Sequence, residues 1–363
     1  MYSLCVCVVF RLNLVNSTKM VVWKEFVTKS VGLGQQQQVR QEISHQGTVF
    51  RVCSDRHTGR NYQGKHNETF QLVPLKKVLK KFLEQPGIMS SILHQHGESD
   101  ENVLQSYRDG TYFKEIFNPG NETFIPINLY SDDFETANPL GSRKGIHKVM
   151  AVYIAFPCLS PQHQASTKNI LLAALCQTRF VNKYGMDCVL EPIVNQLKDL
   201  EKTGISIESK DHYVGIIKPR LFQVIGDNLA LNSMLGYVTS FRANFYCRIC
   251  KMHRDQTHLE TVEKEELLRT EGNFTRDLNV GNFSLTGVRY NTILNSLQQY
   301  HVVQNVAMDA MHDFLEGILP FEMKLVLYEL FSGGQIDLHT LNSRIQTFNF
   351  GFTDKKNRPS LAS

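Results

Sequence analysis

The sequence predicts a mixed α/β fold, a sheet with flanking helices, because two kinds of apolar pattern alternate after about residue 110. The runs of strand length are YFKEIF, FIPINLYSDD, KVMAVYIAF (148–156) and HYVGIIKPRLFQVIGD (212–227). KVMAVYIAF is almost continuous in apolar residues, which is typical of a central strand that is buried on both faces. Segments with helical periodicity lie between the strands, at 170–185 and 189–204, and each ends at a glycine, as helices commonly do.

The chain as a whole suggests three regions. Residues 1–70 are polar and irregular, and we interpret them as a poorly ordered N-terminal arm. Residues 71–245 contain a short helix and then the strands and helices described above. Residues 246–363 are mainly helical, and one long helix, or two helices that meet at Pro320, is expected over 300–334. We interpret this third region as an insert.

The composition favours a folded, reduced protein. Of the 363 residues 42% are hydrophobic and 20% are charged, which allows a sizeable core. Eight irregularly spaced cysteines do not suggest a disulfide framework, and together with thirteen histidines they favour an intracellular protein that uses metals. The net charge of +4 is compatible with nucleic acid without proving it. No segment is apolar over a membrane-spanning length, so no membrane partner is expected.

Acidic residues follow two of the predicted strands. Asp132 and Asp133 end FIPINLYSDD, and Asp227 comes directly after the apolar run 221–225 and Gly226. If the two strands are neighbours, the carboxylates converge and can hold the pair of cations that phosphoryl transfer uses. The alternative is that these aspartates are turn residues, since Asp is favoured in turns at strand ends.

Cys247 and Cys250 form a Cys-x-x-Cys pair, which supplies half of a four-ligand zinc site. No second such pair exists in the sequence. His253 and His258 are the nearby candidates for further ligands, and His301 and His312 lie further along. A thioredoxin-like redox pair is the alternative, but the sequence lacks the helix start that it needs just after the first cysteine. A zinc-dependent deaminase is disfavoured, because no His-x-Glu precedes the pair at a suitable place.

Asp309, His312 and Glu316 are spaced i, i+3 and i+7, so on a helix they would share one face. They can bind a metal or orient a partner carboxylate, and His312 and Asp309 are therefore candidate metal ligands. The alternative is a polar stripe opposite the apolar residues of the same helix. The sequence contains no P-loop and no G-x-S-x-G or G-x-G-x-x-G motif, so nucleotide hydrolysis and serine hydrolase chemistry have no support.

Three ordered blocks, covering about residues 70–360, resemble the CACTA (En/Spm) type DNA transposases. LYSDDFETANPLGSRKGIHKVMAVYIAF resembles the first catalytic block of that family, through DDF (132–134) and NPLG (138–141). GDN followed by CRIC is similar to the second aspartate and the C-x-x-C of the family. MDAMHDFLEG (308–317) resembles the D-x-M-H block.

The resemblance implies an RNase H-like fold with a DDE active site that cuts and rejoins DNA with Mg²⁺ or Mn²⁺ ions. It implies that Asp132 is the first catalytic acid, with Asp133 as the weaker choice, and that Asp227 is the second. It also implies that Cys247 and Cys250 bind Zn²⁺ within a largely helical insert that interrupts the sheet domain. The resemblance also implies that the protein binds DNA at transposon ends, forms a homo-oligomer and is located in the nucleus.

The third acid is the main departure from the family. Its members carry a histidine pair and the catalytic Glu well beyond the D-x-M-H block, and neither is found before Ser363. We therefore expect a C-terminally truncated chain that is inactive alone, with Glu316 as a weak candidate for the third acid. The alternative hypothesis is a non-catalytic, domesticated module that binds DNA or protein. The lysine-rich helix at 72–87 and the mild positive charge motivate that alternative.

Overall fold

The computed structural model describes residues 48–51, 69–93, 106–114, 124–136, 147–164, 166–210, 213–257 and 259–351. Its residues form two compact units, one extending to Asp309 and the other beginning at Ala310. The insert is expected to begin at residue 246, whereas the first unit continues through the cysteine pair. Most of the expected N-terminal arm lies outside the described residues.

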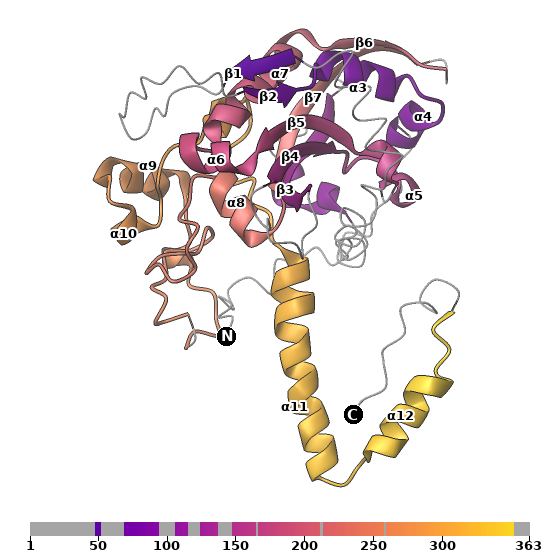
Figure 1. Cartoon of the computed structure of the whole chain (residues 1–363), viewed down its shortest axis with the longest axis vertical. Coiled ribbons are helices and arrows are strands. Elements are labelled where there is room, and N and C mark those ends of the chain that lie inside the picture. Colours follow the sequence, from indigo (N-terminus) through magenta and orange to yellow (C-terminus); the bar gives the residue numbers. More distant parts are fainter. Residues whose placement is uncertain are drawn as a thin grey trace. The chain divides into compact units, whose positions relative to one another are not determined.

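A seven-stranded mixed sheet forms the centre of the first unit (Figure 1). Its strand order is β1-β2-β5-β4-β3-β7-β6. Strand β4 pairs antiparallel with both β3 and β5, whereas β7 runs parallel to β3. The strands are β1 (Thr48–Arg51), β2 (Thr69–Leu72), β3 (Phe124–Glu135), β4 (Lys148–Ala155), β5 (Leu171–Gln177), β6 (Ile205–Glu208) and β7 (Val214–Ile225). The mixed α/β prediction is thereby confirmed.

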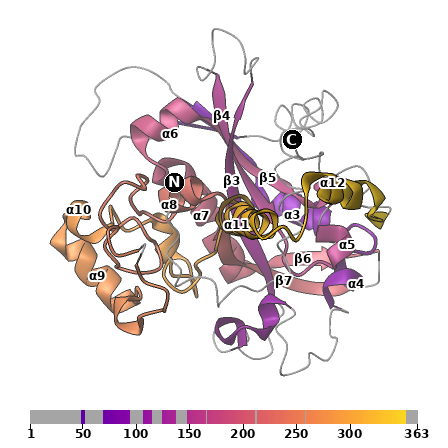
Figure 2. The same ribbon diagram turned by 90° about the horizontal axis from the view of Figure 1, so that it is seen from below.

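Helices alternate with these strands along the chain. In the first unit they are α3 (Leu75–Leu83), α4 (Ile88–Leu93), α5 (Pro161–Gln164), α6 (Thr178–Tyr184), α7 (Asp187–Thr203), α8 (Asn228–Met234), α9 (Glu271–Val280) and α10 (Phe283–Thr286). Both views place α9 and α10 together on one side of this unit, with α3 and α4 on the other (Figures 1 and 2). The second unit contains η8 (Met311–Ile318), which is a π-helix, α11 (Leu319–Ser332) and α12 (Leu338–Thr347). Over the described part of the chain, no helix combines the length and apolarity that crossing a membrane requires.

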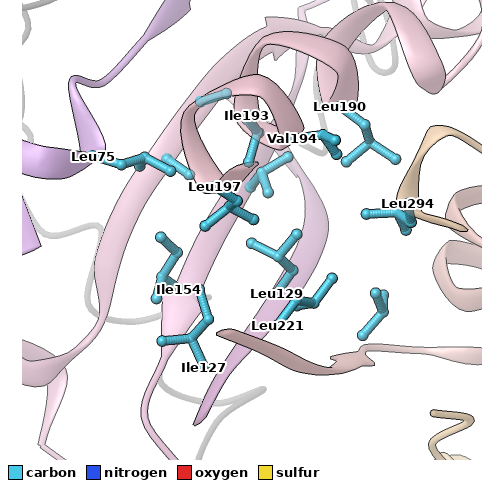
Figure 3. Packing of buried hydrophobic residues seen from close by; sticks show 14 of the residues in the cluster. Leu75, Ile127, Leu129, Ile154, Leu190, Ile193, Val194, Leu197, Leu221 and Leu294 are labelled. Atoms are coloured by element: carbon cyan, nitrogen blue, oxygen red, sulfur yellow. The ribbon is translucent and has the colours of Figure 1, made fainter. Parts of the chain in front are cut away.

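Helix α7 builds the core of the first unit by packing on the sheet. Leu190, Ile193 and Leu197 recur at helical spacing on one face of α7. They lie over Ile127 and Leu129 of β3, and all five side chains are 0% exposed (Figure 3). Full burial of each such side chain contributes roughly 1.5–3 kcal/mol to stability. This packing anchors β3 and leaves its opposite face for other contacts.

Two of the expected elements are wrong. The run ILLAALC, expected to begin a helix, forms strand β5, and the helix starts only at Thr178. A short apolar run suits a buried strand as well as a helix, and here the ladder with β4 decides in favour of the strand. YFKEIF, expected to be a strand, is helical over its described residues 112–114. That turn lets the rings of Tyr112 and Phe113 both contact Phe222.

Candidate metal sites at the strand ends and the cysteine turn

Asp132 and Asp227 occupy matching positions on two neighbouring parallel strands. The last pair in the β3–β7 ladder is Tyr130 with Ile225, and each aspartate follows its strand's member of that pair by two residues. Because side chains alternate along a strand, Asp132 lies on the same face of β3 as Tyr130. The sequence predicts that the two carboxylates converge if their strands are neighbours, and β3 and β7 are neighbours in the sheet.

The electrostatics of Asp132 indicate that the two carboxylates are close. Burial raises the pKa of Asp132, and the negative charge of Asp227 raises it further. The hydroxyl of Tyr130 donates a hydrogen bond to the carboxylate of Asp132, and this hydrogen bond lowers the pKa of Asp132. A divalent cation between the carboxylates would remove their repulsion, so this oxygen-rich pair fits a hard ion such as Mg²⁺.

Asp227 is held by the first turn of α8. Its Oδ1 accepts a hydrogen bond of 2.7 Å from the backbone N–H of Ala230, so that Asp227 is the N-cap of the helix. The cap satisfies one of the N–H groups that a helix leaves without a partner at its start. Regular structure therefore fixes the direction of this carboxylate.

Asp133 points to the other face of β3. Its Oδ1 accepts a hydrogen bond of 3.0 Å from the hydroxyl of Thr178, at the start of α6. Its Oδ2 lies 4.0 Å from Nζ of Lys148 on the neighbouring strand β4. The structure thus separates two adjacent aspartates that the sequence leaves as alternatives, and Asp132 is the one that faces Asp227.

Two tyrosines beside Asp132 were missed by reasoning from the sequence. Tyr130 and Tyr153 are directly paired across β3 and β4, and their rings stack with centroids 6.2 Å apart. Burial raises the pKa of both hydroxyls, for Tyr153 to about 12, and the charge of Asp132 adds to the rise. Both therefore stay protonated at neutral pH, and Tyr130 can act as a donor. The two-residue spacing of Tyr130 and Asp132 was the available signal.

The cysteine pair forms a tight turn around one sulfur atom. Sγ of Cys247 accepts hydrogen bonds from the backbone N–H groups of Ile249, at 3.3 Å, and of Cys250, at 3.5 Å. Cys247 is 9% exposed and Cys250 is 1% exposed. The thiolate is the form of cysteine that binds Zn²⁺, and both sulfurs lie within one short turn. The turn therefore fits half of a tetrahedral thiolate site.

Two of the histidines proposed as further zinc ligands, His253 and His301, are described in the same unit as this turn, and neither joins it in a metal-binding group. His253 lies 3.4 Å from Asp255 and packs against Phe245, and His258 lies outside the described residues. His301 packs edge-on against a phenylalanine ring, and burial lowers its pKa. Within the described ranges, no group of three or more His, Cys, Asp and Glu side chains is arranged to hold one metal ion. The remaining zinc ligands stay unassigned.

Residues 105–273 match the Transposase family tnp2. The matched segment contains β3 and β7, the carboxylate pair and the cysteine turn. The match supports a transposase-derived family for this part of the chain. No curated protein matches the sequence. Asp309, His312 and Glu316 lie beyond the tnp2 match.

Asp309 does not share a helix face with His312 and Glu316. It precedes the helix and belongs to the first unit, whereas the other two lie in η8, where His312 Nε2 and Glu316 Oε2 are 3.9 Å apart. The expected shared face fails because the helix begins only after Asp309. The residues Met311–Ile318 form a π-helix, which ends two residues before Pro320, a residue without an N–H to donate. Asp309 is 1% exposed, and its Oδ2 accepts a hydrogen bond of 3.0 Å from the N–H of Asn228.

Arg248, between the two cysteines, connects them to the residue that follows Asp227. Its Nη1 donates a hydrogen bond of 2.7 Å to Oδ1 of Asn228. Its Nε and Nη2 both donate to the carbonyl of Ala307, at 3.2 and 3.1 Å. These contacts could not be predicted from the sequence, because they join segments that are 20 and 59 residues apart.

Proposed function

We propose that the protein derives from a DNA transposase of the CACTA type and that Asp132 and Asp227 bind a divalent cation for phosphoryl chemistry on DNA. The observation that carries the proposal is their matching position, two residues beyond the last pair of the β3–β7 ladder. The effect of Asp227 on the pKa of Asp132 supports their proximity. The tnp2 match, which includes both residues, supports the transposase origin.

An RNase H-like fold is part of this proposal. Three antiparallel strands, β5, β4 and β3, are followed in the sheet by β7, which is parallel to β3. Asp132 lies in the last part of β3, and Asp227 lies two residues beyond β7. This arrangement supports the fold that the resemblance implies, with the acids near the carboxyl ends of two neighbouring interior strands.

Asp132 and Asp227 would hold the Mg²⁺ or Mn²⁺ ion. A metal ion held there would supply stabilisation of the negative charge on a phosphate oxygen and activation of an attacking water. The chain itself contributes orientation: the hydroxyl of Tyr130 fixes Asp132, and the N–H of Ala230 fixes Asp227. Contacts of this kind set the direction of a ligand and tune its affinity for metal.

We also propose that Cys247 and Cys250 are Zn²⁺ ligands. The two N–H···S bonds to Cys247 and the burial of both sulfurs support this role. His312 stays a candidate metal ligand within the second unit. The hydrogen bond of Asp309 to Asn228 favours a role for Asp309 at α8.

We propose that this chain alone does not cleave DNA. Catalysis of phosphoryl transfer depends on accurate placement of every metal ligand. Over the described residues, no third acid joins Asp132 and Asp227 in a group that could hold a metal. Glu316, the weak candidate, lies in the second unit beside His312.

Nicking of supercoiled plasmid tests the proposed chemistry. The purified chain is incubated with Mg²⁺ or Mn²⁺, and the relaxed and linear products are measured against Asp132→Ala, Asp227→Ala and, as the matched control, Asp133→Ala. We expect no product above background from any of them. Nicking by the wild type that is lost in Asp132→Ala and Asp227→Ala but kept in Asp133→Ala would overturn the inactivity and retain the metal site.

A second candidate function is DNA binding without catalysis, in the nucleus and as a homo-oligomer. The specific observation is that Lys76, Lys77, Lys80 and Lys81 of α3 are all exposed, while Leu75, Leu79 and Phe82 on its other face are buried. Filter binding over a salt series decides, because each phosphate contact adds about 0.9 to the slope of log affinity against log salt. Replacement of the four lysines by Gln should flatten that slope. An unchanged slope would rule α3 out as the contact.

A further inference from the structure

We propose that Arg248 couples the cysteine turn to the carboxylate pair, so that metal binding at Cys247 and Cys250 strengthens metal binding at Asp132 and Asp227. The inference rests on the proposed function and goes beyond it, because it assigns a positioning role to a residue that is a ligand of neither metal.

The guanidinium of Arg248 is the buried centre of a hydrogen-bond network. Arg248 is only 6% exposed. It donates to Asn228 at 2.7 Å, to Asn232 at 3.5 Å and twice to the carbonyl of Ala307. The fixed, planar fork of arginine suits such a multiple contact, and the single charged amine of lysine does not reproduce it.

The network closes on the residue next to Asp227. Asn228, the first residue of α8, accepts from Arg248 through its side chain and donates through its backbone N–H to Asp309. Asp309 comes two residues after Ala307, which Arg248 also contacts. Arg248, Asn228, Asp309 and Ala307 therefore form a ring, and a shift of the cysteine turn moves the start of α8.

A second link runs through Asn232 of the same helix. Asn232 is 1% exposed, and its Nδ2 donates to the carbonyls of Val238, at 2.8 Å, and of Tyr246, at 3.2 Å. Tyr246 directly precedes Cys247. Helix α8 is thus attached to both sides of the first cysteine, through Tyr246 and through Arg248.

These contacts give a physical route for coupling in both directions. A soft ion bound to the thiolates orders the turn and therefore Arg248, which in turn holds Asn228 and the Asp227 cap. The turn, Arg248 and the start of α8 are then already ordered when a hard ion binds the carboxylates. The second ion does not bear the entropic cost of this ordering, so it binds more strongly. Linkage requires the reverse effect to be of equal size, and couplings of this kind are typically about 5–150-fold. We expect a factor of about 5–10.

Arg269 offers a matched control. It is 5% exposed, and its Nε donates a hydrogen bond of 3.0 Å to the carbonyl of Cys247. Its other nitrogens bond the carbonyl of Thr286, at 2.9 Å, and Asp277 of α9, at 3.3 Å. Arg269 therefore fixes the same turn to α9 and α10, and none of these three hydrogen bonds goes to α8.

The experiment uses the full chain with Cd²⁺ as the thiolate probe and Mn²⁺ as the carboxylate probe. Cd²⁺ binding is followed by the ultraviolet absorbance of the Cd–thiolate bond, and free Mn²⁺ by electron paramagnetic resonance. In the wild type, one equivalent of Cd²⁺ should lower the Kd for Mn²⁺ about 5–10-fold, and Mn²⁺ should strengthen Cd²⁺ binding equally. Arg269→Lys should keep this coupling. The Arg248→Lys variant should still bind each ion, but the factor by which Cd²⁺ changes the Kd for Mn²⁺ should be close to one.

Each contrary result has a distinct meaning. Coupling that persists in Arg248→Lys, or that is lost equally in both variants, would overturn the positioning role, because both arginines would then act only through stability. Thermal unfolding of the two variants shows whether they are equally folded. Mn²⁺ binding that ignores Cd²⁺ in the wild type would overturn the coupling alone. Absence of Mn²⁺ binding, or binding unaltered in Asp132→Asn, would overturn the proposed carboxylate site and the coupling with it.

Discussion

The carboxylate pair and the cysteine turn are built in different ways. Asp132 and Asp227 are placed by regular structure, the β3–β7 ladder and the N-cap of α8. The cysteine turn instead depends on side chains from elsewhere in the chain. Among them are Arg269, which bonds the carbonyl of Cys247, and Asp277, whose Oδ1 lies 2.7 Å from Nζ of Lys251 at the end of the turn. The position of a side chain that is placed by regular structure can be predicted from the local sequence. The contacts that hold the cysteine turn cannot be predicted in this way, because they come from distant side chains.

The largest effect should appear at the cysteine turn when a ligand is removed. Cys247→Ser should weaken Cd²⁺ or Zn²⁺ binding by at least about 100-fold, more than the roughly 10–100-fold cost of losing a supporting contact. Cys188→Ser is the control, because Cys188 is a partly buried cysteine on α7 that donates to the carbonyl of Tyr184. Competition with a chromophoric chelator measures both. Equal loss in the two variants would show that the turn is not the thiolate site.

Changing one carboxylate of the pair should weaken metal binding less than Cys247→Ser does at the cysteine turn. Asp132→Asn should weaken Mn²⁺ binding by roughly 10–100-fold, since one charged ligand remains in Asp227. Asp133→Asn should leave the affinity unchanged, because Asp133 faces Thr178 and Lys148 on the other side of β3. Calorimetric titration with Mn²⁺ distinguishes them. A larger loss in Asp133→Asn would reverse our assignment of the first acid.

The same contrast explains what the sequence could predict. Strands β3, β4 and β7 and helix α7 follow from apolar runs and their periodicity, and the acidic end of β3 and the acid beyond β7 follow from the local sequence. The helical prediction for ILLAALC fails because a short apolar run carries no period, and only its partner β4 selects the strand. The expected face shared by Asp309, His312 and Glu316 fails because the helix begins after Asp309.

The supporting contacts could not be predicted from one sequence. The partners of Arg248 lie 20 and 59 residues away, and only the fold brings them together. The separation of Asp132 from Asp133 depends on which strand lies beside β3 and on which face α7 covers. The roles assigned to these residues in metal binding and in DNA chemistry remain predictions.

A smaller effect should separate the two duties of Asp227. Asp227→Ala removes the cap of α8 and should lower the free energy of unfolding by about 1 kcal/mol. Asp227→Asn keeps a side-chain oxygen for Ala230 N and should lose much less stability, while Mn²⁺ binding weakens in both variants. Urea denaturation without metal gives the comparison. Equal stability of the two variants would mean that the cap contributes little.

The smallest effect concerns the metal-free protein and its dependence on pH. Burial and the charge of Asp227 raise the pKa of Asp132, so the folded state holds this proton more tightly than the unfolded chain. The resulting stability is present below the ordinary pKa of Asp and is lost as pH rises through the raised value. Asp132→Asn cannot ionise and avoids that loss, so its melting temperature relative to wild type should increase with pH over this window.

Added Mn²⁺ should reverse that order at neutral pH, since the ion stabilises the folded wild type through its two carboxylates and the variant through only one. Melting curves at acidic and neutral pH, with and without Mn²⁺, measure both effects. A wild type that stays less stable than Asp132→Asn in saturating Mn²⁺ would mean that the ion does not relieve the repulsion between Asp132 and Asp227. The carboxylate pair would then need a further ligand before it binds a metal.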